Sequence, residues 1–183
     1  MMKRVLWILL VVFIAVQFIP VSKTNPAASP SQTLYATHSV PPNIQSILDR
    51  SCRDCHSNET VWPWYSHVAP ASWLVSHDVK EARKEVNLSL WGTYNDKRKK
   101  RKLEEMCEQV REGEMPDSTY TLIHRNARLT PEERTAICAW TDALGKSLPS
   151  TESASSQSTV PSSQQPHLKD SAKQATIPTL SNR

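Results

Sequence analysis

The feature that most constrains this chain is a pair of cysteines followed at once by a histidine, with the spacing C-x-x-C-H, at Cys52, Cys55 and His56. Two thiols with this spacing lie about one helical turn apart, so each can bond one of the two vinyl groups of a single porphyrin. The histidine after the second cysteine then lies under the iron and becomes its proximal ligand. The motif therefore predicts a domain built around one covalently attached haem c.

Two other uses of paired cysteines fit the sequence less well. A structural zinc site needs a second ligand pair, and the other two cysteines, Cys107 and Cys138, are far apart. A thioredoxin-like redox motif needs a βαβ context, and no strand-rich segment surrounds the C-x-x-C-H residues. Cys107 and Cys138 themselves have two open interpretations, a disulfide or two buried free thiols, because the distance between their α-carbons does not follow from the sequence.

The N-terminal segment predicts export. Lys3 and Arg4 precede a mostly apolar run from Val5 to Val21, which is typical of a signal sequence. The run is near the short limit for a membrane-spanning helix, and no small-residue cleavage site follows it closely. We therefore expect residues 1–21 to be a retained signal anchor that holds the protein on the periplasmic side of the inner membrane. Secretion into the periplasm after signal cleavage is the alternative.

The remainder divides into three parts by composition. We expect a linker over residues 22–37, one small domain over residues 38–146, and a disordered tail rich in Ser, Gln and Pro over residues 147–183. The whole chain contains three glycines, which leaves little material for tight β-hairpins. An all-α domain is therefore expected.

Apolar periodicity and helix start signals predict about four helices around the haem. The last of them should stop at Gly145, and the segment over residues 113–129 should be irregular. The four helices are expected to begin at Pro42, at Pro70, at Asp96 (ending near Glu112), and at Thr130, where a capping box precedes Pro131.

The haem motif is the first of several short blocks within residues 38–144. These blocks are Cys52–Asn58, Trp62–Tyr65, Trp91–Tyr94, Lys102–Glu105, Gly113–Pro116 and Tyr120–His124. In this order they resemble the haem-binding domain family of small, membrane-anchored c-type cytochromes. The resemblance covers nearly all of the expected domain and implies haem binding in an anchored, exported domain, without naming a physiological partner.

The second axial ligand of the iron is expected to be Met115. It lies in a Met-Pro step just after the third helix, and small cytochromes often present their distal methionine on such a loop. His77 and His124 are the alternatives. Met106 lies on the apolar stripe of its helix and is expected to pack in the core.

The surroundings of the haem can also be anticipated. The aromatic residues within 62–65 suit a porphyrin wall, because they exclude water from the iron. The proximal histidine needs a carbonyl acceptor for its other ring nitrogen, and Pro63 and Pro70 are the candidates for supplying it.

Six consecutive basic residues occupy Lys97–Lys102 at the start of the third helix. The helix dipole makes this an unfavourable place for cations, at a cost of a few tenths of a kcal/mol for each exposed charge. A solvated charge run is one interpretation, and a docking patch for an acidic redox partner or for anionic lipid is the other. A nucleic-acid partner is not expected on the exported side.

These features together predict a membrane-anchored, all-α, cytochrome c-like electron carrier rather than an enzyme. With His56 and Met115 both bound, the iron has no open position and changes charge with little rearrangement. The alternative is a haem enzyme or sensor, peroxidase-like or binding a small gas, with an open distal site. The sequence shows no distal Arg/His pair of the kind that would indicate peroxidase chemistry.

Overall fold

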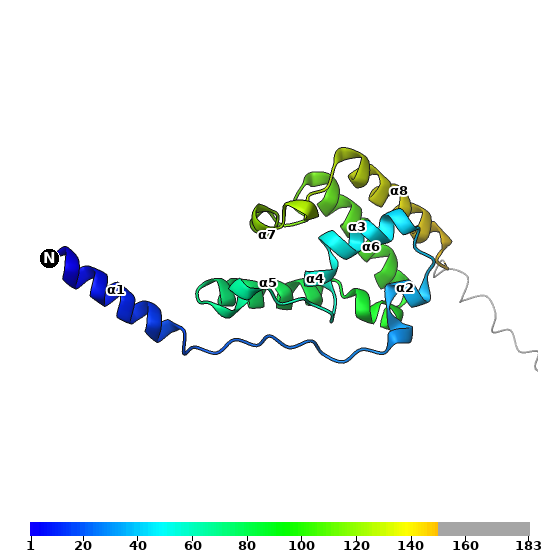
Figure 1. The fold of residues 1–183 in the computed structure, drawn as a ribbon. Coiled ribbons are helices and arrows are strands. Elements are labelled where there is room, and N and C mark those ends of the chain that lie inside the picture. The colour runs from blue at the N-terminus through cyan, green and yellow to red at the C-terminus, as the bar shows by residue number, and fades with distance from the viewer. Residues whose placement is uncertain (150–183) are drawn as a thin grey trace, which may run out of the picture. The chain divides into compact units, whose positions relative to one another are not determined.

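The computed structural model describes residues 1–149, and this part of the chain is built from helices without a strand (Figure 1). The all-α prediction is thus confirmed, whereas the expected disordered tail lies, from residue 150 onward, outside the described residues. The α-helices are α1 (Met2–Val16), α2 (Leu34–Thr37), α3 (Pro42–Ser51), α4 (Arg53–His56), α5 (Ala71–Glu85), α6 (Asp96–Glu112), α7 (Ser118–Ile123) and α8 (Pro131–Ser147). Short 3₁₀ helices join them: η1 (Pro30–Gln32), η2 (Trp64–His67), η3 (Leu88–Thr93) and η4 (Arg125–Ala127).

The four predicted helices are present as α3, α5, α6 and α8. Two expectations about their ends and connections are wrong. The helix α8 continues through Gly145 to Ser147, and Leu148 just beyond it is buried in the core. Burial of this leucine outweighs the cost of about 1 kcal/mol that a glycine imposes inside a helix. The segment expected to be irregular contains α7, whose N-cap Asp117 accepts hydrogen bonds from the backbone N–H groups of Thr119 and Tyr120.

One apolar core joins the helices of the domain. Leu48 of α3, Leu103 of α6 and Ile137 of α8 are almost fully buried in it, together with Trp91 of η3. The helix α6 packs mainly along α8, whereas α4 and η2 pack against α5. Met106 is partly buried against this core, as expected.

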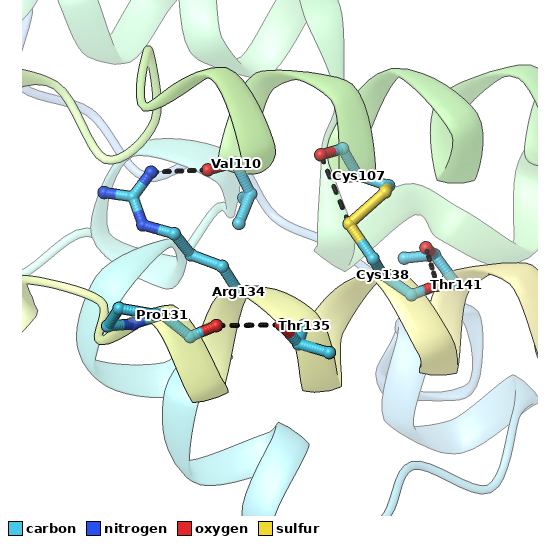
Figure 2. Close-up of a disulfide and its surroundings, with 7 residues drawn as sticks. All are labelled: Cys107, Val110, Pro131, Arg134, Thr135, Cys138 and Thr141. Carbon is cyan, nitrogen blue, oxygen red and sulfur yellow. Dashed lines mark hydrogen bonds between the residues drawn. A yellow bond between two sulfur atoms is a disulfide. The ribbon is translucent and has the colours of Figure 1, made fainter.

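A disulfide links α6 to α8 (Figure 2). The α-carbons of Cys107 and Cys138 lie 4.7 Å apart, which is within the range that the bond requires. Next to it, the guanidinium of Arg134 on α8 donates a hydrogen bond of 2.6 Å to the carbonyl of Val110 on α6. The disulfide is the alternative that the structure supports. The helix α6 ends at Gly113, whose φ of 84° lies in the left-handed region that favours glycine.

The N-terminal helix α1 has fifteen residues and ends at Val16, before the end of the apolar run. Among residues 1–149, no helix is both long enough and apolar enough to cross a membrane. The side-chain amide of Gln17, which follows α1, donates to the carbonyl of Ala69 and accepts from its N–H.

Candidate functional site

The C-x-x-C-H motif forms a single helical turn of its own. Cys52 lies between α3 and α4 with φ −127° and ψ −39°, outside the regular helix. Its carbonyl accepts hydrogen bonds from the backbone N–H groups of Cys55, at 3.2 Å, and His56, at 2.9 Å. Both cysteines and the histidine therefore belong to this one turn.

Both thiols of the motif are free and partly buried. Burial is the largest cause that raises the pKa of Cys52 to about 12 and the pKa of Cys55 to about 11. The carboxylates of Asp54 and Asp78 raise the pKa of Cys55 further. At neutral pH both groups are therefore thiols rather than thiolates, and thiols are weak nucleophiles and weak metal ligands. Within residues 1–149 there is no group of three or more His, Cys, Asp or Glu side chains that could hold a metal ion.

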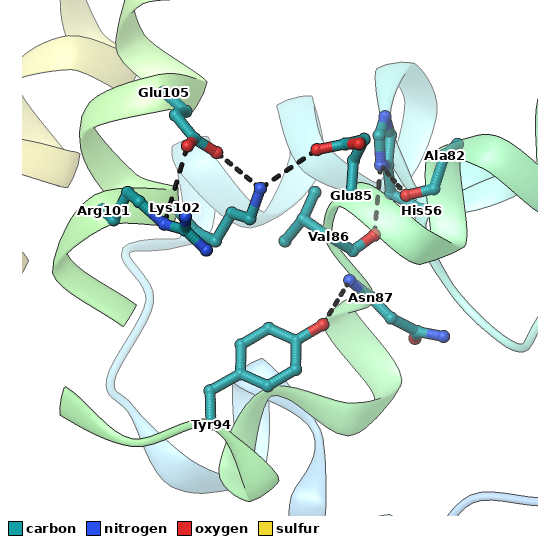
Figure 3. Close-up of polar contacts among 9 residues, drawn as sticks. All are labelled: His56, Ala82, Glu85, Val86, Asn87, Tyr94, Arg101, Lys102 and Glu105. Carbon is teal, nitrogen blue, oxygen red and sulfur yellow. Dashed lines mark hydrogen bonds and ion pairs between the residues drawn. The ribbon is translucent and has the colours of Figure 1, made fainter. Parts of the chain in front are cut away.

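The imidazole of His56 is fixed by two backbone carbonyls (Figure 3). Its Nδ1 lies 3.0 Å from the carbonyl oxygen of Ala82 and 3.2 Å from that of Val86. Because a carbonyl oxygen only accepts, Nδ1 must carry the proton, and Nε2 is left with the lone pair that binds metals. Burial lowers the pKa of His56, which favours this neutral form. The ring thus has the protonation that a metal-binding imidazole requires.

The acceptors of this hydrogen bond differ from those expected. Pro63 and Pro70 do not supply the carbonyl that His56 contacts, so that prediction is wrong. The turn α4 directs the ring toward the C-terminal end of α5. Carbonyl groups at a helix end lack some of their intrahelical partners. The carbonyl of Ala82 nevertheless also accepts from the backbone N–H of Val86, so its bond to the imidazole is a second one.

A cleft of about 150 Å³ opens beside Cys55. Apolar side chains of α5, such as Leu74 and Val75, form one part of its lining, and Tyr120 and Ile123 of α7 form another. Cofactor pockets usually have volumes of about 300–1,000 Å³. A haem bound beside Cys55 must therefore spread the walls of this cleft.

Three polar side chains in the cleft are joined to one another. The hydroxyl of Tyr65 is hydrogen-bonded to Nε2 of His124 at 2.6 Å, and the ring of Tyr120 stacks on the same imidazole with centroids 4.3 Å apart. The hydroxyl of Tyr120 donates to Asp54 at 3.2 Å, so the network reaches back to the haem motif. Burial and the charge of Asp54 raise the pKa of Tyr120, and its hydroxyl stays protonated. The expected aromatic wall is present only in part: Tyr65 lines the cleft, whereas the Trp64 side chain is 80% exposed.

The unpaired indole groups bear on the fit to haem. The buried Nε1–H groups of Trp62 and Trp73, like that of Trp91 in the core, have no hydrogen-bond partner among the described residues. Trp62 and Trp73 do not line the cleft themselves but are next in sequence to Val61 and Leu74, which do. Buried donors are rarely left unpaired. A cofactor that brings acceptor oxygens, such as the propionates of haem, suits these positions.

The three predicted candidates for the second axial position lie in different surroundings. Met115 is 38% exposed and is not among the residues that line the cleft. His77 is exposed on α5. His124 lines the cleft beside Cys55. Tyr120 and His124 belong to one of the blocks that carry the family resemblance, which assigns the tyrosine no role, and the structure brings both residues to the motif.

The basic run does not form one continuous exposed patch. Lys102 is buried and contacts the carboxylates of Glu85 and Glu105, because its position on α6 faces the end of α5. The guanidinium of Arg98 lies 3.9 Å from the centre of the Tyr94 ring. The exposed cations of the run are Lys97, Arg98 and Arg101.

Comparison with known proteins identifies a family. Residues 11–143 match the family model described as a haem-binding domain, a span that includes the motif, the cleft and the disulfide. No curated protein and no solved structure matched the chain significantly. Since the family model covers well over half of the sequence, this chain belongs to the haem-binding domain family.

Proposed function

We propose that this protein carries one haem c, attached by thioether bonds from Cys52 and Cys55, with His56 Nε2 as the proximal ligand. The observation that carries the proposal is the fixed imidazole: two carbonyls hold Nδ1, and both thiols belong to the same helical turn. Each thiol adds across one vinyl double bond. The sulfur–carbon bond forms, the thiol hydrogen goes to the other vinyl carbon, and no oxidant is required.

The protonated state of the thiols bears on how attachment takes place. Because the pKa values of Cys52 and Cys55 are raised by burial, few thiolates form at neutral pH, and unassisted addition should be slow. Dedicated attachment machinery on the exported side of the membrane supplies the needed activation. The basic residues and apolar helix at the N-terminus support export to the periplasmic side, with α1 and the residues after it as the membrane anchor.

Electron transfer is the proposed role of the attached haem. Haem supplies one-electron exchange, and the chain supplies a fixed proximal ligand and a cleft with a largely apolar lining. With Met115 as second ligand, the iron would have no open position, as a carrier needs. The exposed cations Lys97 and Arg101 are proposed to dock an acidic redox partner.

One observation favours a second candidate function. Met115 lies partly exposed and outside the cleft, whereas His124 and two tyrosines line it. An iron without bound methionine would keep an open position next to hydrogen-bonding side chains. A haem enzyme or gas sensor is therefore the alternative to the electron carrier.

Covalent attachment is tested by making the full chain together with haem-attachment machinery. The haem should stay with the protein in acidified organic solvent, and its spectrum in alkaline pyridine should be that of a thioether-linked haem. Cys52→Ala and Cys55→Ala should each leave one thioether at most and lower the yield of holoprotein, and His56→Ala should abolish it. The control His67→Ala, an exposed histidine outside the motif, should load normally. Complete extraction of haem from the wild type would show that the proposal is wrong.

Membrane attachment is tested by fractionation and N-terminal sequencing of the mature protein. An uncleaved signal should leave Met1 or Met2 at the N-terminus and the protein in the membrane fraction after a high-salt wash. A mature N-terminus near Pro30 together with a soluble protein would favour secretion over anchoring.

A further inference from the structure

The last turn of α5 is held from outside by a buried lysine (Figure 3). The side chain of Lys102 is 8% exposed, and its ammonium lies 3.1 Å from Glu85 and 2.5 Å from Glu105. Glu105 lies one turn further along the same helix α6, whereas Glu85 is the final residue of α5. The lysine is therefore fixed by its own helix and reaches across to the helix that orients the haem-motif histidine.

A second contact holds the chain two residues later. The buried N–H of Asn87 donates a 2.9 Å hydrogen bond to the hydroxyl of Tyr94. The tyrosine ring is held between Trp91, 5.7 Å away centre to centre, and the guanidinium of Arg98 on α6. Between these two anchored positions lies Val86, whose carbonyl accepts from the imidazole.

These contacts matter because they link α5 directly to α6, although each helix packs chiefly against other elements. The helix α5 packs against α4 and η2, and α6 packs chiefly against α8. The end of a helix frays easily unless something outside it holds the last turn. The bond from Nδ1 of His56 to Val86 is already 3.2 Å long, so a shift of about 1 Å at this turn would break it.

We infer that Lys102 and Tyr94 are positioning residues for His56: by clamping residues 85–87 they keep the carbonyls of Ala82 and Val86 on Nδ1 and so direct Nε2. The clamp consists of the Lys102–Glu85 ion pair and the Tyr94–Asn87 hydrogen bond. Burial opposes the charge on Lys102, but the hydrogen bonds that its ammonium donates to Glu105 and Glu85 outweigh burial and raise the pKa of the lysine. The lysine is thus charged at neutral pH. The effect of the clamp on the iron rests on the proposed ligation by His56. The effect of the clamp on the imidazole does not depend on that proposal.

The test measures how fast the Nδ1 proton of His56 exchanges with solvent, by NMR of the reduced, haem-loaded full chain. Loosening the last turn of α5 should raise this exchange rate by about tenfold or more in Lys102→Met and in Tyr94→Phe. Lys102→Arg, which keeps a charged donor, should restore a rate within about threefold of the wild type. The control Lys84→Met removes a 2.6 Å pair with Glu81 that lies entirely within α5, and should leave the rate unchanged.

Equal exchange rates in the wild type, Lys102→Met and Tyr94→Phe would overturn the inference. If Lys102→Met does not fold, Glu85→Gln decides, because the Glu85 side chain is 75% exposed and its loss leaves Lys102 paired with Glu105. That variant should exchange faster than the wild type, and an unchanged rate counts against the clamp. If the haem proposal fails, the preparation will contain no covalent haem, and this will be visible before the exchange measurement. In that case the haem-free chain should still show faster exchange of the Nδ1 proton in Lys102→Met and Tyr94→Phe than in the wild type.

Discussion

Removing the disulfide between α6 and α8 should lower the stability of the domain without altering its haem site. Cys107 and Cys138 are separated by 31 residues in the sequence. In the chain-entropy model, a loop of this length reduces the entropy of the unfolded chain by about 12 cal/mol/K, equivalent to about 3.7 kcal/mol at 25 °C. The double variant Cys107→Ala/Cys138→Ala should therefore lose about 3–4 kcal/mol of unfolding free energy.

The expected loss from removing the disulfide is large relative to the total unfolding free energy of a domain. Single domains have unfolding free energies of about 5–15 kcal/mol, so the variant should still fold but with a much lower margin. For a domain of this size, a loss of this magnitude corresponds to a fall in Tm of roughly 15–20 °C. The packing between α6 and α8, including the bond from Arg134 to Val110, should keep the helices together at room temperature.

Equilibrium unfolding in urea, followed by circular dichroism and tryptophan fluorescence, measures the effect. Addition of a reductant should bring the wild type down to the variant and leave the variant unchanged, which makes the variant its own control. A loss below about 1 kcal/mol would refute the entropy argument. Titration of two free thiols in the denatured, haem-loaded wild type would refute the disulfide itself.

Three further predictions concern the iron, the surface and pH. In Met115→Ala the iron should become partly high-spin and bind carbon monoxide quickly, as absorption spectra would show; an unchanged spectrum would mean that methionine is not the ligand. Changing Lys97 and Arg101 to glutamine should slow reduction by an acidic partner protein at low salt, and stopped-flow rates should converge as the Debye length falls to about 8 Å at physiological ionic strength. Burial, followed by the charge of Lys99, lowers the pKa of His38, so the unfolded chain binds the proton more readily and stability falls as the pH drops below about 6.5. Urea unfolding at pH 7.5 and 5.5 should therefore show a smaller decline for His38→Phe, and equal declines would contradict the assignment.

Helices with explicit end signals could be predicted from the sequence. The capping box at Thr130 is present, with its hydroxyl accepting from the N–H of Glu133 and the carboxylate of Glu133 accepting in return. The helix α6 has the predicted bounds, with Asn95 as its cap. The short helix α7 was missed although Asp117 is a typical N-cap residue. Six residues show too little apolar periodicity to be recognised against a loop.

The haem motif could be predicted because it is local in the sequence. The carbonyls that accept from its imidazole could not, because they are distant in the sequence. The geometry of Cys52, Cys55 and His56 depends on one local turn, whose hydrogen bonds span only a few residues. The carbonyls that fix the imidazole belong to Ala82 and Val86, more than twenty-five residues away. Which helix end faces the motif depends on tertiary packing, and no local pattern encodes it.

The way in which α6 is held limits how Met115 could reach an iron in the cleft. This helix is joined to α8 by the disulfide and to α5 by Lys102, so it is poorly placed to carry Met115 toward the cleft as a rigid body. The N–H of Met115 also donates to the carbonyl of Gln109 within α6. Ligation by this methionine must therefore come from rearrangement of the loop after Gly113. His124 already lines the cleft, but its Nε2 is hydrogen-bonded to Tyr65 and would have to give up that bond to reach an iron. Each alternative thus breaks a different contact: a spectrum that changes in Met115→Ala implies loop movement, and one that changes in Tyr65→Phe implies release of the histidine.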